Sequence, residues 1–129
     1  MIRKCDLTLK SIVDGTENSF FAEGRLEDFG EKIKVCYRED PAVIHVTFQG
    51  GKAWVDRDGD YSLLLELSQG EVTKGKIGIN GNVGELEIRT HLIENSYFGD
   101  GLNARLKYDI LLGEGVQEME LLIQAKVKE

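Results

Sequence analysis

The sequence is poor in the residues that mark secreted, metal-binding or membrane-spanning proteins. In 129 residues it has one proline, two cysteines and two histidines. No apolar run approaches the length of a membrane span, and the N-terminal stretch MIRKCDLTLKSIVDG contains no continuous apolar segment of signal-peptide length. We therefore expect one soluble domain over residues 1–129, located in the cytoplasm and making no contact with a membrane.

Positive charge is also scarce. The chain carries 23 acidic and 16 basic residues, a formal net charge of -7, and the two signs are interspersed without a basic run. Such a surface repels phosphate backbones, so nucleic acid is not an expected partner.

The few cysteines and histidines do not suggest a site. Cys5 falls in the apolar phase of its segment and Cys36 in the polar phase, which predicts one buried thiol, one exposed thiol and no disulfide. His45 and His91 both fall in outward phase, no cluster has zinc spacing, and DRDGD (residues 56–60) lacks the glutamate that completes a calcium loop. No metal and no cofactor is predicted.

Alternation dominates the rest of the sequence. Nearly every segment alternates apolar and polar residues, with turn residues about every ten positions, which predicts an all-β protein. The expected strands are residues 3–12, 19–27, 31–39, 43–49, 52–57, 61–67, 73–79, 85–93, 102–112 and 117–127. Each has one apolar and one charged face.

Short connections predict the topology. FQGGKA, RDGDY and EDFGEK fit tight hairpin turns, so consecutive strands should pair antiparallel. An even number of strands lets the last pair with the first. We predict a single closed antiparallel up-and-down barrel of eight to ten strands, with a two-sheet sandwich as the alternative.

Arg57 interrupts the apolar phase of AWVDRDGDYSLLLEL (residues 53–67). Matching strands through their turns places one inward level at one end of the barrel, made of Ser11, Phe20, Glu39, Ile44, Arg57 and Tyr61. Glu39 and Arg57 would then lie two strands apart, about 9–10 Å at the backbone, which an ion pair can bridge. The hydroxyls of Tyr37 and Tyr61 would lie within reach of this barrel mouth.

Two interpretations of the mouth compete. In the first, the ion pair closes the end of a packed barrel and fixes strand register. In the second, Arg57 with Tyr37 or Tyr61 receives the carboxylate or phosphate of a small amphipathic ligand, whose apolar part enters the interior. An enzyme is a third class. It is disfavoured because Glu39 is the only obvious acid or base and no serine has an inward histidine, so no catalytic residue is predicted.

Two large apolar residues fall on the outward phase. The register predicted above pairs Trp54 with Leu64 on the side that should face water. Such a pair could nucleate a subunit contact, so a homodimer through this outer face is a candidate. The alternative function is accordingly a protein-interaction or regulatory barrel with a packed interior and no ligand.

Four stretches carry a resemblance to a known family. VCYRED, WVDRDGDY, GELEIRTHL and LKYDILL, in this order and spacing, resemble the calycin-like β-barrel proteins of bacteria typified by YwiB. The resemblance covers nearly the whole chain and implies a lipocalin-like closed barrel, but no activity. Calycin-like barrels commonly hold small apolar or amphipathic molecules, so the resemblance adds Thr90 and Tyr108 to the candidate ligand-binding residues Arg57, Glu39, Tyr37 and Tyr61.

Overall fold

The computed structural model describes residues 1–128, which form ten β-strands joined by short turns. The strands are β1 (Ile2–Val13), β2 (Thr16–Asp28), β3 (Lys32–Glu39), β4 (Ala42–Gln49), β5 (Lys52–Asp58), β6 (Ser62–Ser68), β7 (Val72–Ile79), β8 (Asn82–Tyr97), β9 (Gly101–Leu112) and β10 (Gly115–Val127). All ten predicted strands are present, and β8 extends furthest beyond its predicted bounds. In this part of the chain no helix is long and apolar enough to cross a membrane.

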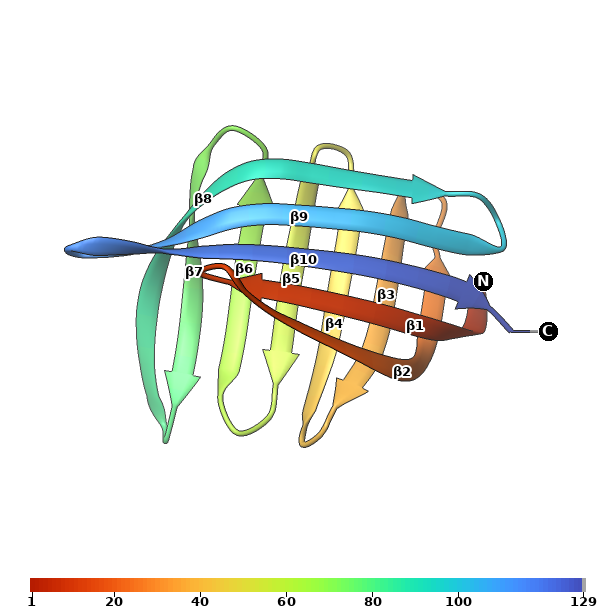
Figure 1. The fold of residues 1–129 in the computed structure, drawn as a ribbon, viewed down its shortest axis with the longest axis horizontal. Coiled ribbons are helices and arrows are strands. Elements are labelled where there is room, and N and C mark those ends of the chain that lie inside the picture. Colours follow the sequence, from red (N-terminus) through yellow and green to blue (C-terminus); the bar gives the residue numbers. More distant parts are fainter. Residues whose placement is uncertain (129) are drawn as a thin grey trace.

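The sheet is a closed antiparallel up-and-down barrel, as predicted. Every strand pairs with its neighbours in sequence, and β10 pairs with β1 from Cys5–Val127 to Val13–Met119. Figure 1 shows that the barrel is flattened: β8, β9, β10, β1 and β2 form one layer, and β3 to β7 cross behind it at a steep angle. The sandwich alternative is wrong, because the two layers are continuous through β2 and β8.

Those two long strands make the corners of the barrel. The first part of β8 pairs with β7 and its second part with β9, with a bulge between Thr90 and Leu92. β2 pairs with β1 over its length but with β3 only over residues 24–28. At the β2 bend, a Cβ on Gly24 would lie 2.2 Å from the carbonyl oxygen of Cys36, so no larger residue fits there.

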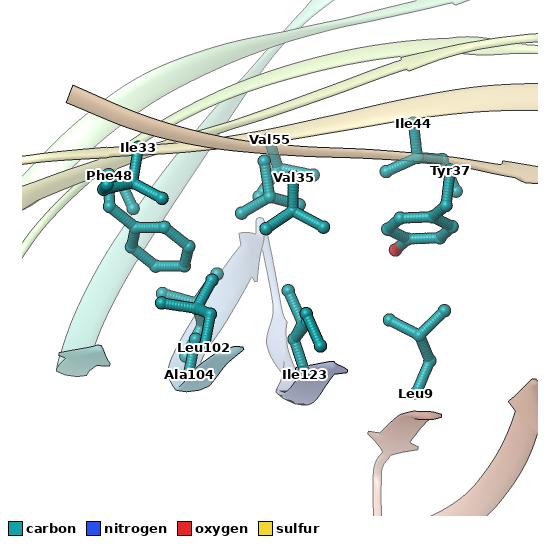
Figure 2. Packing of buried hydrophobic residues seen from close by; sticks show 14 of the residues in the cluster. Leu9, Ile33, Val35, Tyr37, Ile44, Phe48, Val55, Leu102, Ala104 and Ile123 are labelled. Carbon is teal, nitrogen blue, oxygen red and sulfur yellow. The ribbon is translucent and has the colours of Figure 1, made fainter. Parts of the chain in front are cut away.

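The apolar faces point inward as the alternation predicted. In Figure 2, Val35 and Val55 from one layer lie over Ile123 from the other, and Tyr37 lies over Leu9. The centre of the barrel is therefore filled by side chains that meet from both layers. A ligand whose apolar part occupies the centre does not fit this packing.

Two predicted registers are wrong by two residues. The β4–β5 pairing is as expected, with Ile44 opposite Arg57. Across the next hairpin, however, Arg57 pairs with Leu63 rather than Tyr61, because the connection is longer than predicted. Likewise Leu26 pairs with Val35 and not Ile33. A slip of two preserves which face each side chain occupies, so the inward set survives while the neighbours change.

Candidate functional site

Arg57 lies in one inward level at the end of the barrel where the β3–β4 and β5–β6 turns lie. The level follows the registers through Gly24, Tyr37, Ile44, Arg57, Leu63 and Ile77. Arg57 is the one charged member of this set and its side chain is only 15% exposed. We call this end, from Tyr37 to Ile77, the Arg57 rim.

The partner of Arg57 is Asp60 and not Glu39. Nη1 of Arg57 donates to Oδ1 of Asp60 at 2.9 Å and to the carbonyl oxygen of Tyr61 at 3.0 Å. The guanidinium carbon also lies 3.8 Å from the ring centre of Tyr61, a cation–π contact. Glu39 is exposed at the end of β3 and forms no ion pair with Arg57 in the described residues, so the predicted pair is wrong.

The longer β5–β6 turn explains this exchange of partners. The turn folds back over the end of β5, which brings a carboxylate three residues along the chain onto the guanidinium. Gly59 allows the fold, because a Cβ there would lie 2.7 Å from the Cα of Ala42. The hydrogen bond from Arg57 in turn lowers the pKa of the Asp60 carboxyl.

Arg57 keeps unused hydrogen-bonding capacity. Both of its hydrogen bonds to described residues come from Nη1, which leaves the donors of Nε and Nη2 for another group. A planar fork of this kind matches the two oxygens of a carboxylate or phosphate.

A groove of about 560 Å³ runs outward from Arg57 over the ends of β4 to β8. Its apolar lining residues are Val43, Leu63, Leu64, Ile77 and Val83, and its charged ones are Asp56, Arg57, Asp58 and Lys76, beside His45. The volume is that of a small-molecule site. The apolar space next to Arg57 therefore lies at the rim and outside it, where the sequence analysis had placed it inside the barrel.

Tyr37, a member of this rim, and the neighbouring Tyr108 both face the barrel interior and are 5% exposed. Burial, the charge of Glu39 and the nearby Tyr108 raise the pKa of Tyr37 far above its ordinary value. Burial and the nearby Tyr61 raise the pKa of Tyr108 to about 12. The phenols of Tyr37 and Tyr108 therefore stay protonated and can donate hydrogen bonds.

Thr90 does not join this site. It pairs with Tyr108 in register, but its backbone N–H donates to Glu71 at 3.1 Å and its carbonyl accepts from Gly70 at 2.9 Å. Glu71 and Gly70 belong to the β6–β7 turn, at the opposite end of β6 from Leu63, the partner of Arg57. The side chain is 1% exposed, and its Oγ1 has no hydrogen-bond partner among the described residues.

A cluster on the outer face of β2, β3 and β4 escaped the sequence analysis. Cys36 faces outward as predicted, yet it is only 4% exposed, so the expected exposed thiol is wrong. Its Sγ lies 3.0 Å from Oε2 of Glu27 and 3.1 Å from Nδ1 of His45, which cover it. Burial and then the hydrogen bond to Glu27 raise the pKa of the Cys36 thiol to about 11. No periodic signal reports such cover by neighbouring strands.

The two cysteines are both free, and Cys5 is fully buried inside. Over residues 1–128, no group of three or more histidine, cysteine, aspartate or glutamate side chains is arranged to hold a metal ion.

Comparison with known proteins confirms the fold. No protein-family model matches the chain, and no curated protein sequence matches it. The structure is similar to the crystal structure of the ywiB protein from Bacillus subtilis, with a TM-score of 0.84 and 19% sequence identity over 99% of this chain and 94% of that one. The resemblance to YwiB predicted from the four stretches is confirmed, and at this identity it establishes the shared barrel fold and no activity.

Proposed function

We propose that this YwiB-like barrel binds a small amphipathic anion at the Arg57 rim. A carboxylate or phosphate would accept hydrogen bonds from the free donors of Arg57. The apolar part of the ligand would lie in the adjoining groove along Leu63, Ile77 and Val83. The single observation that carries the proposal is a guanidinium only 15% exposed, at the edge of that apolar groove, with two nitrogens that have no partner among residues 1–128.

The aspartates around Arg57 determine how a ligand anion enters the site and how much charge it can carry. Its side chain is 59% exposed, so its ion pair with Arg57 is screened by water and salt and is readily exchanged. An incoming anion can share the guanidinium through Nε and Nη2 or displace Asp60. Asp56 and Asp58 on the same groove repel a second negative charge, which favours a monoanion over a polyanion.

The proposal is tested by NMR titration of the ¹⁵N-labelled protein with octanoate, and with octylamine as the cationic counterpart. Octanoate should shift resonances at the Arg57 rim and octylamine should not. Arg57→Gln should weaken octanoate binding by about 10- to 100-fold, the worth of hydrogen bonds to a charged group. Arg105→Gln is the matched control, because Arg105 also has a carboxylate partner, Glu120 at 2.8 Å, but lies on the opposite layer.

A second pair of variants tests the apolar half of the site. Val83 lines the groove and is 75% exposed, whereas Val72 is 51% exposed and lies outside it. Val83→Asp should abolish octanoate binding by charge repulsion, and Val72→Asp should leave it unchanged. The proposal would be refuted if octanoate bound equally well to a variant and to its matched control in either pair. It would also be refuted if octylamine shifted the same resonances as octanoate.

A second candidate function follows from the packed interior. A filled barrel can serve as a protein-interaction module, and we propose a second copy of this chain as the partner at the Trp54 face. Trp54 pairs with Glu66 and not with Leu64 as expected, yet both apolar residues line one depression of about 240 Å³. This depression is also lined by Glu66, Lys74, Lys76 and Glu85, so both charge signs are present for a self-complementary contact. Sedimentation velocity of the wild type and of Trp54→Ala tests this role, which is supported if the wild type is a dimer and Trp54→Ala is a monomer.

A further inference from the structure

The outer surface of the front layer carries an uncharged row that crosses five strands. The registers place Ser96, Asn103, Gln124, Thr8 and Phe21 side by side on β8, β9, β10, β1 and β2. All five side chains are exposed, and Phe21, at 82%, is the most exposed aromatic residue of the described chain. We call this set the amide row.

Four of the five members of the amide row line a concave surface, and Phe21 lies outside it. An open groove of about 580 Å³ is lined by Thr8, Gln124, Asn103 and Ser96, with the half-buried Leu122 beside them. Neighbouring strands are about 4.8 Å apart, so the row from Ser96 to Phe21 spans roughly 19 Å. That is a long and narrow surface, suited to an extended ligand.

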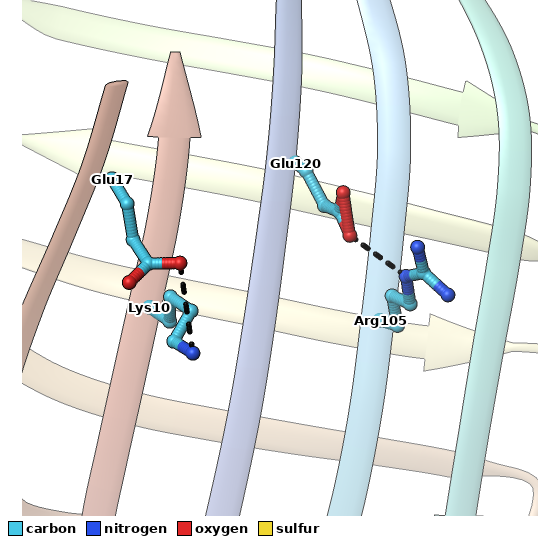
Figure 3. A network of polar contacts seen from close by, with 4 residues as sticks. All are labelled: Lys10, Glu17, Arg105 and Glu120. Carbon is cyan, nitrogen blue, oxygen red and sulfur yellow. Dashed lines mark hydrogen bonds and ion pairs between the residues drawn. The ribbon is translucent and has the colours of Figure 1, made fainter. Parts of the chain in front are cut away.

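Most of the charges that flank the row are paired with one another. On one side, Arg105 donates to Glu120 at 2.8 Å and Lys10 lies 3.6 Å from Glu17; both pairs are drawn in Figure 3. On the other side, Lys128 lies between two carboxylates. The row itself is uncharged, on a chain with a net charge of -7. Two charges beside it, Glu94 in the same groove and Lys126 next to Gln124, form no ion pair with another described residue.

From this geometry we infer that the amide row binds a linear, uncharged oligosaccharide. Asparagine and glutamine side chains both donate and accept, as do the hydroxyls of serine and threonine, so they match vicinal sugar hydroxyls, which also do both. Phe21 supplies an apolar plane on which the C–H face of a sugar ring packs.

Other ligands fit this strip less well. A polyanion fits less well, because Arg105, Lys10 and Lys128 are already paired with carboxylates. The remaining lysine beside the row, Lys126, lies opposite Asp6, and Glu94 adds a negative charge to the groove. An extended peptide that adds by β-pairing would run along a free strand edge, as on β2 or β8 at the two ends of the row, and not across the five strands as the row does. The amide row lies on the layer opposite the strands that carry the Arg57 rim, so this inference is independent of the proposed anion site.

NMR titration with cellohexaose, chitohexaose and maltohexaose tests the inference on the whole protein. At least one hexasaccharide should shift the side-chain amide resonances of Asn103 and Gln124. Phe21→Ala and Gln124→Ala should each weaken that binding by about 2- to 10-fold, the worth of one aromatic or hydrogen-bonding contact. The matched controls are Phe29→Ala and Gln49→Ala, which remove an exposed aromatic ring and an exposed amide away from the row.

Three results would overturn the inference. The first is the absence of shifts with all three hexasaccharides. The second is a binding affinity that is the same in Phe21→Ala and Gln124→Ala as in the two control variants. The third is a dimer in sedimentation velocity that Phe21→Ala converts to monomer, because the row would then be covered by a second copy of the chain.

Discussion

Replacing Thr90 with valine tests how dry and how well packed the barrel interior is. The Thr90 hydroxyl is buried and has no partner in the described chain, so folding removes it from water without compensation. An unsatisfied buried polar group costs about 1–3 kcal/mol. Valine has nearly the same shape, removes that cost and buries one more methyl group, worth up to about 1 kcal/mol. Thr90→Val should therefore raise the free energy of unfolding by about 1–3 kcal/mol.

The measurement is equilibrium urea unfolding followed by far-ultraviolet circular dichroism, with Thr73→Val as the matched control. Thr73 lies on the neighbouring strand, where its hydroxyl donates to the carbonyl of Glu66. Removing that bond should lower stability by about 1 kcal/mol, so the two substitutions should have opposite signs. A loss of stability in Thr90→Val would refute the reasoning, because it would mean that the hydroxyl has a partner such as an internal water. Thr90→Ala would be uninformative, since it leaves a cavity in either case.

Three further predictions concern single residues. Gly24→Ala should leave the chain unfolded at room temperature, as judged by circular dichroism. Gly113→Ala should be tolerated, because a Cβ there meets nothing within 4 Å. A folded Gly24→Ala protein would contradict the assigned bend. The pKa of Asp60 is lowered in the folded state, so the stability that its carboxylate contributes is present above the unfolded pKa near 4 and is lost as pH falls through the folded pKa. Asp60→Asn should therefore reduce the fall in unfolding free energy at acid pH. An unchanged fall would count against the contact with Arg57. In a Cys5→Ser background at pH 8, iodoacetamide should alkylate Cys36 at least about 100-fold more slowly in the native protein than in the urea-unfolded protein, because the pKa of the native Cys36 thiol is raised to about 11. Equal rates would show that the thiol is not covered.

The fold was predictable because alternation carries most of the information in a meander. Which residues face inward depends only on parity, and hairpin connections leave few topologies, so the closed ten-stranded barrel follows without any motif. The flattening into two crossing layers was not predictable. It depends on where β2 and β8 bend, and the requirement for glycine at position 24 of β2 comes from Cys36 on another strand.

The candidate site was predictable only in part. An arginine in inward phase identified the rim correctly, and Tyr37, Tyr61 and Tyr108 do lie next to it. The partner of Arg57 was missed because the length of one turn decides it, and turn length changes pairing by two residues without changing any face. The buried state of Cys36 was missed for a related reason: parity tells which face a side chain occupies, but not whether neighbours such as Glu27 cover it.

The two ends of the barrel differ in how far neighbouring backbone covers the free edge of a corner strand. At the end with the β6–β7 turn, residues 92–97 of β8 pair with β9 alone, but the turn covers the start of this edge. Gly70 and Glu71 bond to Thr90, and the side-chain carbonyl of Gln69 accepts from the backbone N–H of Ile93 at 2.9 Å. At the other end, residues 16–23 of β2 pair with β1 alone, beyond the point where β3 separates from them. An unpaired strand edge is an aggregation hazard that a barrel normally removes by closure. The β2 edge lies at the same end of the barrel as Arg57, so this end can open with the loss of fewer backbone hydrogen bonds than the end covered by the β6–β7 turn, which is consistent with the anion site proposed there.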